Sequence, residues 1–132
     1  MLKRTVLWLC LTLVIVGSVI AQEKQKMGVE DLVICTAVEN RQPAGVDSVF
    51  SNTVDRLYCF TTVTGAEDTT SVYQVWQFKD EVKAKIKLKI GAKSWRTWSS
   101  KKIVKEWVGP WSVEVVTKDG DVLARKMFRV KE

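Results

Sequence analysis

The run from Val82 to Ile90 constrains the fold more than any other stretch of this chain. Its apolar residues alternate with Lys83, Lys85, Lys87 and Lys89. A period of two places successive side chains on opposite faces of a β-strand, whereas a helix would scatter the lysines around its circumference. The run therefore predicts a long strand with one face on a core and a lysine face that meets water or an anion.

Other stretches also have the character of strands. The stretch 71–78 is apolar on both faces, as a central strand would be. Trp95 and Trp98 lie in a second short strand, and their opposite parity allows only one of them to reach the core unless a bulge intervenes. Further strands are expected over 32–39, 57–63, 111–117 and 122–130. Some eight strands with no helical period predict an all-β fold, a single antiparallel β-sandwich of the immunoglobulin-like type.

The clearest strand pairing is predicted at the C-terminal end, where Asp119-Gly120 is a preferred type I′ hairpin turn. A two-residue loop would pair Thr117 with Val122, Val115 with Ala124, Trp111 with Phe128 and Glu114 with Arg125. The same register sets Lys126 opposite Val113 on the apolar face. This position implies a bulge, an edge strand or a lysine stem that reaches past the core to water.

The stretch 40–55 connects two of the predicted strands and is longer than the usual hairpin loop. It is therefore expected to be functional or to pack over an open end of the fold. Its apolar side chains, Val46, Val49 and Phe50, favour packing.

The first 21 residues have the composition of a secretory signal peptide. Lys3 and Arg4 precede an apolar run, and Val19 and Ala21 occupy the positions where small residues favour cleavage, before Gln22. An uncleaved anchor is the alternative, but the apolar run is short for a membrane span and a polar segment follows it. The predicted organisation is signal peptide 1–21, polar segment 22–31 and β-sandwich domain 32–132. The protein would be periplasmic or secreted, with no transmembrane span once processed.

Positive charge is concentrated in one part of the chain. Removal of the signal peptide leaves 19 basic and 15 acidic residues, a net charge of +4. The stretch 79–105 holds ten basic residues against Asp80 and Glu81, so the rest of the processed chain is net negative. This asymmetry favours contact with an anionic partner through that stretch.

Cys35 and Cys59 are the two cysteines that remain in the processed chain. In an oxidising compartment an even count favours a disulfide, which would close a loop of 25 residues and stabilise the fold by about 3.5 kcal/mol. The alternative is a pair of small buried side chains on neighbouring strands, with both thiols free.

A set of tryptophan-rich motifs fills the C-terminal half. They are W-R-T-W-S-S-K over 95–101, Trp107, G-P-W-S-V-E-V over 109–115 and Asp119-Gly120. Together with the stretches 35–43 and 57–61, they resemble the bacterial family called domain of unknown function 2914. The resemblance implies an extracytoplasmic β domain with no established activity. Gln74 stands where members often carry histidine, and Lys79-Asp80 replaces an Asn-Gly turn, so no histidine chemistry is carried over from the family.

The composition excludes several classes of enzyme. The chain contains no histidine, which removes Ser-His-Asp and Cys-His mechanisms and the commonest zinc and iron ligands. Two cysteines do not make a four-thiolate site, and the sequence has no glycine-rich phosphate loop. The adjacent acidic pairs Glu30-Asp31, Glu67-Asp68 and Asp80-Glu81 would point apart on a strand or be solvated in a turn. The prediction is a protein that is not an enzyme, with no catalytic residue, metal site or cofactor.

The candidate ligand-binding residues are Lys83, Lys85, Lys87, Lys89, Arg96, Trp98 and Lys101. The lysines would either bind an anionic surface or only keep a strand soluble and unpaired at its edge. The tryptophans would either fill the core or form a platform for a sugar or a protein, with Arg96 and Trp98 as a cation–π pair.

These residues predict a non-catalytic extracytoplasmic module for binding or protein interaction. The expected partner is an envelope protein, or an anionic envelope polymer or lipid, and not a nucleic acid. A purely structural β domain with a solubilising lysine face is the alternative, and a carbohydrate-binding module is a further one.

Overall fold

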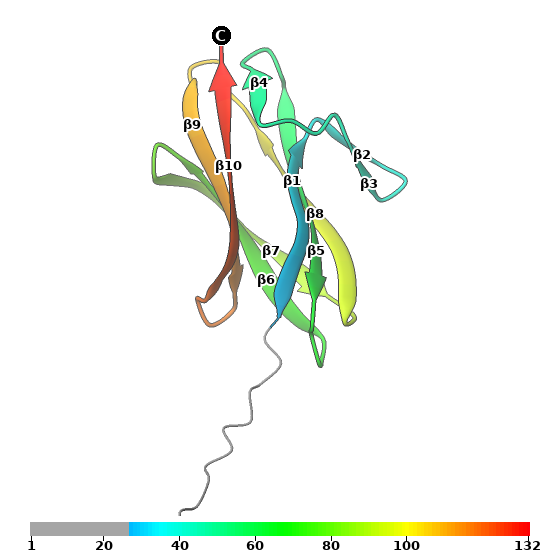
Figure 1. The fold of residues 1–132 in the computed structure, drawn as a ribbon. Helices are drawn as coiled ribbons and strands as arrows, with labels where there is room; N and C mark the ends of the chain where they lie inside the picture. The colour runs from blue at the N-terminus through cyan, green and yellow to red at the C-terminus, as the bar shows by residue number, and fades with distance from the viewer. Residues whose placement is uncertain (1–26) are drawn as a thin grey trace, which may run out of the picture.

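A computed structural model describes residues 27–132, which form ten β-strands and no helix (Figure 1). The strands are β1 (Gly28–Cys35), β2 (Ala37–Glu39), β3 (Gln42–Ala44), β4 (Val49–Ser51), β5 (Arg56–Thr64), β6 (Thr70–Phe78), β7 (Glu81–Ile90), β8 (Ser94–Lys102), β9 (Gly109–Thr117) and β10 (Val122–Lys131). The predicted signal peptide, 1–21, lies outside the described residues and stays a prediction.

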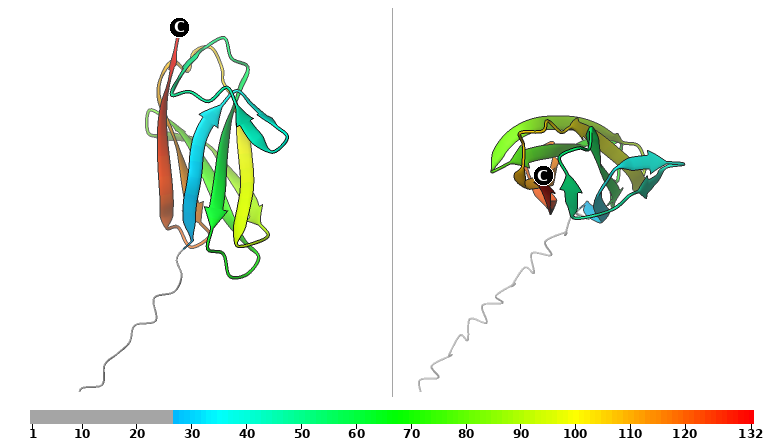
Figure 2. Two further views of the ribbon diagram at one scale, coloured as in Figure 1. Left: turned by 45° about the vertical axis from the view of Figure 1, so that its right-hand side comes forward. Right: turned by 90° about the horizontal axis from the view of Figure 1, so that it is seen from above.

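The strands form two facing sheets and a separate hairpin (Figures 1 and 2). One sheet has the order β1-β5-β8 and the other the order β4-β10-β9-β6-β7, while β2 pairs with β3. The predicted all-β sandwich is confirmed. The pairings are antiparallel except for β4 with β10, which is parallel.

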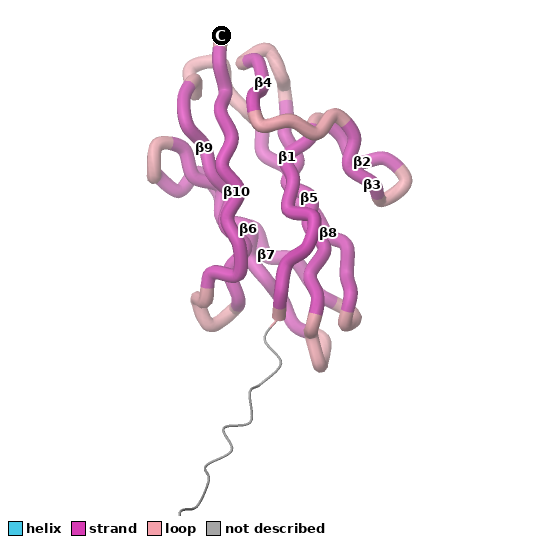
Figure 3. Tube along the Cα trace, in the orientation of Figure 1, coloured by secondary structure: helices cyan, strands magenta, loops and turns pink. Residues whose placement is uncertain are grey.

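Seven of the eight or so expected strands are assigned residues from the sequence, and the structure has three more than these seven, for two reasons. Figure 3 shows where the strands and loops lie. The strand expected over 32–39 starts earlier, at Gly28, and divides at Thr36 into β1 and β2. The stretch 40–55, expected to be a connection, contains the short strands β3 and β4.

The core lies between the two sheets and is built around two tryptophans. Trp76 of β6 is 0% exposed and Trp111 of β9 is 1% exposed. The ring of Phe128 from β10 lies 6.1 Å from Trp76 and 5.8 Å from Trp111, centroid to centroid. Aromatic pairs at such distances add about 0.5–1.5 kcal/mol each beyond their burial. These contacts confirm a core role for Trp111, one of the four tryptophans of the motif region.

A hydrogen-bonded group of three buried side chains links the two sheets. The Ser99 hydroxyl of β8 donates to Gln74 Oε1 of β6 and accepts the indole N–H of Trp76, at 2.9 Å. Gln74 Nε2 is buried and has no hydrogen-bond partner among the described residues. Buried polar groups need hydrogen-bond partners. The Ser99 hydroxyl supplies one partner to the Trp76 indole and one to the Gln74 amide oxygen.

The C-terminal hairpin confirms most of the predicted register. Val115 pairs with Ala124, Trp111 with Phe128, Glu114 with Arg125 and Val113 with the half-buried Lys126. The predicted type I′ turn is wrong, because that turn needs positive φ at both central residues and Gly120 alone has it, at 94°. The Gly120 N–H instead donates to the Thr117 carbonyl, at 3.0 Å. Val122 consequently pairs with Val116 rather than Thr117, and a bulge before Ala124 restores the register.

The lysine run forms the strand β7, as its alternation predicts, and β7 lies at one edge of the five-stranded sheet. Lys79 and Asp80 join it to β6 with φ of 48° and 65°, the geometry of a type I′ turn. The register shifts between Trp76 and Gln77, which leaves Lys83 as an extra residue on β7. The predicted alternation is therefore broken at one place, because this bulge turns the Lys83 side chain inward.

The stretch 40–55 packs over the fold only in part. Phe50 of β4 is 5% exposed, and its ring meets that of Phe128 edge to face at 6.1 Å. Val46 and Val49 are 52% and 40% exposed, so the prediction that they pack is wrong. The hairpin of β2 and β3 projects beside the three-stranded sheet (Figure 2).

Candidate functional site

The seven predicted binding residues fall at three places rather than one. Lys85, Lys87 and Lys89 lie on the outer face of the five-stranded sheet, the face that points away from the other sheet. Lys83 and Lys101 lie where the edge strands β7 and β8 face each other. Arg96 and Trp98 lie on the outer face of the three-stranded sheet. Because the two outer faces point in opposite directions, the residues do not share one surface.

Lys85, Lys87 and Lys89, called the lysine face below, pair across β6 with Val75, Tyr73 and Ser71. All three lysines are exposed, and none forms an ion pair with a carboxylate of residues 27–132. The ammonium of Lys85 lies 4.6 Å from the centroid of the Tyr73 ring. Alternate residues of a strand stand about 6.6 Å apart, so the lysine face is a row of positive charge about 13 Å long.

Lys83 and Lys101 lie over an aromatic side chain, and Lys83 also forms an ion pair with the exposed Glu81, at 3.4 Å. Each ammonium lies 5.1 Å from the centroid of the Trp107 ring. Trp107 packs in turn on Phe78 and Trp111, at centroid distances of 6.4 and 5.7 Å. The expectation that Lys83 points outward with the other lysines is wrong, because the bulge in β7 directs it to this ring.

The two tryptophans of β8 divide between the faces of the sheet, as their parity predicts. Trp95 packs against the core cluster around Val115, whereas Trp98 stacks on Phe60 at the outer face, with the ring centroids 6.0 Å apart. Arg96 Nη1 donates to the carbonyl of Arg41, at 3.3 Å. The predicted cation–π pair of Arg96 with Trp98 is not formed among the described residues.

A groove of about 400 Å³ lies on the outer face of the three-stranded sheet, beside the hairpin of β2 and β3. Its lining, the hairpin groove, consists of Asp31, Val33, Gln42, Pro43, Phe60, Thr62 and Arg96. Sequence reasoning found Arg96 and missed the others. Asp31 enters the groove through a bulge in β1, and Gln42 and Pro43 enter it through the hairpin, and neither feature has a clear signal in the sequence.

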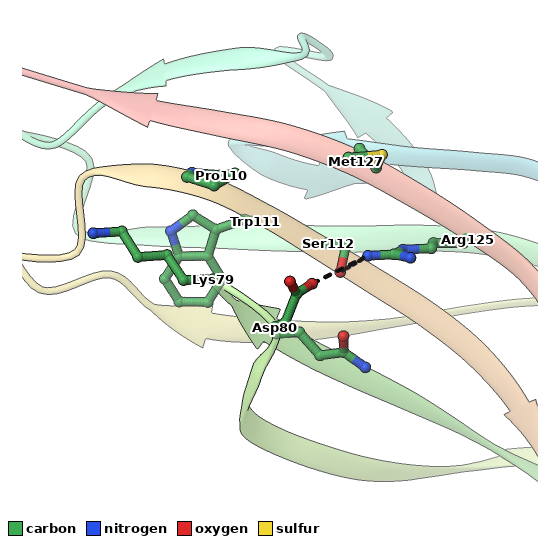
Figure 4. A pocket seen from close by; sticks show the side chains of 8 residues that line it. Lys79, Asp80, Pro110, Trp111, Ser112, Arg125 and Met127 are labelled. Carbon is green, nitrogen blue, oxygen red and sulfur yellow. Dashed lines mark hydrogen bonds and ion pairs between the residues drawn. The ribbon is translucent and has the colours of Figure 1, made fainter.

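A smaller cleft, of about 150 Å³, lies beside the turn between β6 and β7 (Figure 4). Arg125 occupies it, with Nη2 3.7 Å from Asp80 and Nε 4.0 Å from Glu114. The same guanidinium donates to the Ser112 hydroxyl, at 3.3 Å. These contacts engage the Arg125 guanidinium within the protein rather than leave it free for a ligand.

Cys35 and Cys59 are both free and buried, so the predicted disulfide is absent and the alternative holds. Cys59 pairs with Ile34, whereas Cys35 pairs with Tyr58. Adjacent positions of a strand face opposite sides, which places the two thiols on opposite faces of the sheet. Burial raises the pKa of both thiols, and the neighbouring Cys35 raises the pKa of Cys59 further.

In the part of the chain that the structure describes, no group of three or more Cys, Asp or Glu side chains could hold a metal ion. The same part contains no helix long and apolar enough to cross a membrane.

Two facing sheets of three and five strands define an all-β sandwich protein. Residues 69–130, which cover nearly all of β6 to β10, match the family model described as "Protein of unknown function (DUF2914)". The resemblance found in the sequence is therefore confirmed over these residues. The matched part includes the lysine face, both lysines at Trp107 and the C-terminal hairpin.

Similar solved structures come from much longer proteins. A β-glucosidase from Kluyveromyces marxianus is 15% identical with a TM-score of 0.48, over 82% of this chain and 15% of that chain. A β-glucosidase from Listeria innocua, in complex with glucose, is 14% identical with a TM-score of 0.46, over 81% of this chain and 16% of that chain. No curated protein matches the chain.

Proposed function

We propose that this chain is a non-catalytic binding module of the bacterial envelope that contacts phosphate-bearing anionic material through its lysine face. The observation that carries the proposal is the row of Lys85, Lys87 and Lys89, exposed and without carboxylate partners in residues 27–132. A lysine close to an anionic surface contributes up to about 1 kcal/mol. The row therefore contributes up to about 3 kcal/mol of attraction, which acts over a Debye length of about 8 Å at physiological salt.

The neighbours of the lysine face support this role. The facing residues of β6 are uncharged. Val75, which pairs with Lys85 on one side, pairs on its other side with Glu114 of β9. Glu114 is already paired with Arg125, at 4.0 Å. The carboxylate nearest in register therefore pairs with Arg125 and forms no ion pair with Lys85.

The compartment in the proposal comes from the N-terminal sequence. The signal peptide predicted over 1–21 would deliver the module to the periplasm or the medium, where phosphate-bearing lipids and envelope polymers are the abundant anions. The competing function is structural, with the same lysines only keeping the edge strand β7 soluble.

The test compares two triple variants. Lys85→Gln, Lys87→Gln and Lys89→Gln together remove the lysine face, while Lys102→Gln, Lys105→Gln and Lys118→Gln remove equal charge from exposed positions elsewhere. Each protein is sedimented with vesicles of phosphatidylglycerol and phosphatidylcholine, and with phosphatidylcholine alone, at low and moderate salt. We expect the wild type and the control to bind the anionic vesicles, and the lysine-face variant to bind up to about a hundredfold more weakly.

A second arm separates the sources of phosphate. A soluble poly(glycerol phosphate) chain is titrated into the same three proteins. If the wild type and the control bind this polymer more tightly than the anionic vesicles, and the lysine-face variant loses that binding, the partner is a polymer rather than a lipid. If the wild type binds neither probe at low salt, or if both triple variants lose binding equally, the proposal is overturned and the structural function stands.

A further inference from the structure

We propose that the hairpin groove is a second binding site, which takes an uncharged hydroxylated ring, as in a saccharide. This site lies on the opposite sheet from the lysine face and does not depend on the function proposed above. Three features of the groove point to such a ligand: the backbone that builds it, the hydrogen-bonding groups that line it, and the residues beneath it.

The groove is built by two local departures from regular β structure. In β1 the register shifts between Glu30 and Val33, so that Asp31 and Leu32 lie opposite one residue of β5. Asp31 takes a φ of 52°, which turns its carboxylate to the outer face while Leu32 packs on the core. Gln42, from the start of β3, brings its amide to the other wall of the groove.

The polar groups of the groove have unused hydrogen-bonding capacity. Asp31, Gln42 and Arg96 are exposed, and neither the Asp31 carboxylate nor the Gln42 amide bonds another residue of 27–132. Arg96 uses Nη1 for the Arg41 carbonyl, which leaves most of its five donors free. The groove therefore offers a carboxylate that accepts hydrogen bonds, guanidinium N–H groups that donate them, and an amide that can donate and accept.

The charges of the groove select against ions. Asp31 and Arg96 both line it without forming an ion pair. An anion at Arg96 would be repelled by the carboxylate, and a cation at Asp31 would be repelled by the guanidinium. A hydroxyl group suits both, because it donates to a carboxylate and accepts from a guanidinium. The lining consequently fits a ligand that carries several hydroxyls and no net charge.

The floor of the groove fits a ring. Phe60 lies beneath it, 3% exposed and held against Trp98 with the two rings at 16° to each other, and the half-buried Val33 and Pro43 supply most of the apolar surface. A pyranose has an apolar face of C–H groups and a rim of hydroxyls, so it would place the face on this floor and the rim on the polar groups. A volume of about 400 Å³ suits a ligand of one or two such rings.

The test uses the domain labelled with ¹⁵N and three probes: cellotriose, chitotriose and the zwitterionic dipeptide alanyl-alanine. We expect one or both oligosaccharides, at millimolar concentration, to shift the amide signals of Val33, Phe60 and Thr62 and the indole N–H signal of Trp98. Asp31→Asn, which keeps a residue that tolerates positive φ, and Arg96→Gln should each weaken the binding at least tenfold. Lys102→Gln, on the same strand but outside the groove, should leave it unchanged.

Each other outcome overturns the proposal. If neither oligosaccharide shifts these signals at tens of millimolar, the groove does not bind saccharides. If alanyl-alanine shifts them more strongly, the ligand is zwitterionic. Shifts that persist in both the Asp31 and the Arg96 variants, with each variant folded by its amide spectrum, would place the binding elsewhere on the domain. The lysine-face variant serves as a further control. It should lose vesicle binding but keep oligosaccharide binding, so each of the two proposals can be wrong without the other.

Discussion

Lys83 and Lys101 come from different sheets and lie at the same distance, 5.1 Å, from the ring of Trp107. Lys83 belongs to β7 and Lys101 to β8, and Trp107 precedes β9. No hydrogen-bonded strand pair joins β7 to β8 among the described residues. The two lysines and the Trp107 indole therefore connect the edges of the two sheets on the side where β7 and β8 face each other.

The first prediction concerns these cation–π contacts. Lys83→Gln and Lys101→Gln should each lower the free energy of unfolding by about 0.5–1 kcal/mol, because each removes one ammonium from the Trp107 ring. In a Trp107→Leu background the same substitutions should have almost no effect, since the ring is gone. Urea unfolding of all the variants measures both effects. Equal losses in the two backgrounds would show that the lysines stabilise the fold through other contacts.

The second prediction concerns the turn between β6 and β7. Lys79 and Asp80 both have positive φ, which disfavours ordinary side chains, so Lys79→Asn with Asp80→Gly should stabilise the fold by about 1 kcal/mol. The lost ion pair of Asp80 with Arg125 matters little because the Asp80 side chain is 92% exposed. Thermal unfolding gives the shift in Tm.

The matched control introduces a side chain at a glycine with positive φ, in the turn between β9 and β10. Gly120→Ala, at φ 94° with no atom within 4 Å of the new Cβ, should destabilise by about 1 kcal/mol through backbone strain alone. A turn variant that melts at or below the wild-type temperature, while Gly120→Ala destabilises as expected, would mean that the native turn carries no strain.

The third prediction compares two members of the buried polar group. Ser99→Ala leaves the indole N–H of Trp76 and Gln74 Oε1 without partners, so it should cost about 2–4 kcal/mol. Gln74→Met should cost less, about 1 kcal/mol, because it also removes the buried Nε2 that has no partner. Chemical denaturation ranks the two variants. The opposite order would mean that the Gln74 amide, rather than the Ser99 hydroxyl, is the centre of the group.

The fourth prediction is a pH dependence that follows from the free thiols. The pKa of both Cys35 and Cys59 is raised from an ordinary value of 9.0, so the folded state keeps two protons that the unfolded state releases above that pH. The stability that the neutral thiols contribute is therefore full below pH 9.0 and is lost as the pH rises further. Urea unfolding at neutral pH and above pH 9.0 should show a larger loss for the wild type than for the Cys35→Ala, Cys59→Ala variant.

Lysine and tyrosine titration affects both of those proteins alike, so the difference between them isolates the thiols. Identical pH slopes would argue that the thiols ionise equally easily in the folded and unfolded states. Protein purified without reductant should also take up an alkylating reagent at both cysteines after unfolding. Failure to do so would mean that the two residues do form a disulfide.

The sequence predicted those parts of the fold that depend on a period of two within one strand. The alternation from Val82 to Ile90 predicts β7, and the parity of Trp95 and Trp98 predicts that only one of the two reaches the core. The Asp119-Gly120 signal fixed the pairing of β9 with β10 except near the turn. In each case the information is local, because a strand places its side chains by position alone.

The positions of the candidate site residues depend on bulges and on pairing between strands, which have no local signal in the sequence. The bulge at Lys83 arises from how β7 pairs with β6, and the residues beside Lys83 do not mark it. The hairpin groove needs the bulge at Asp31 together with a hairpin that folds over β5. The free thiols follow from the register of β1 on β5, which is set by tertiary pairing rather than by the spacing of Cys35 and Cys59.

The regular pairing of β8 has a consequence for how copies of this domain behave in solution. β8 pairs with β5 over nine consecutive residues without a bulge, and its other edge has no strand partner among residues 27–132. An unpaired, regular strand edge of this kind is a template for pairing with a second chain. Two β8 edges would each bring Arg96, Lys101 and Lys102, so electrostatic repulsion keeps them apart at low ionic strength. Concentrated salt, which screens that repulsion, is therefore the condition in which the domain should begin to aggregate edge to edge.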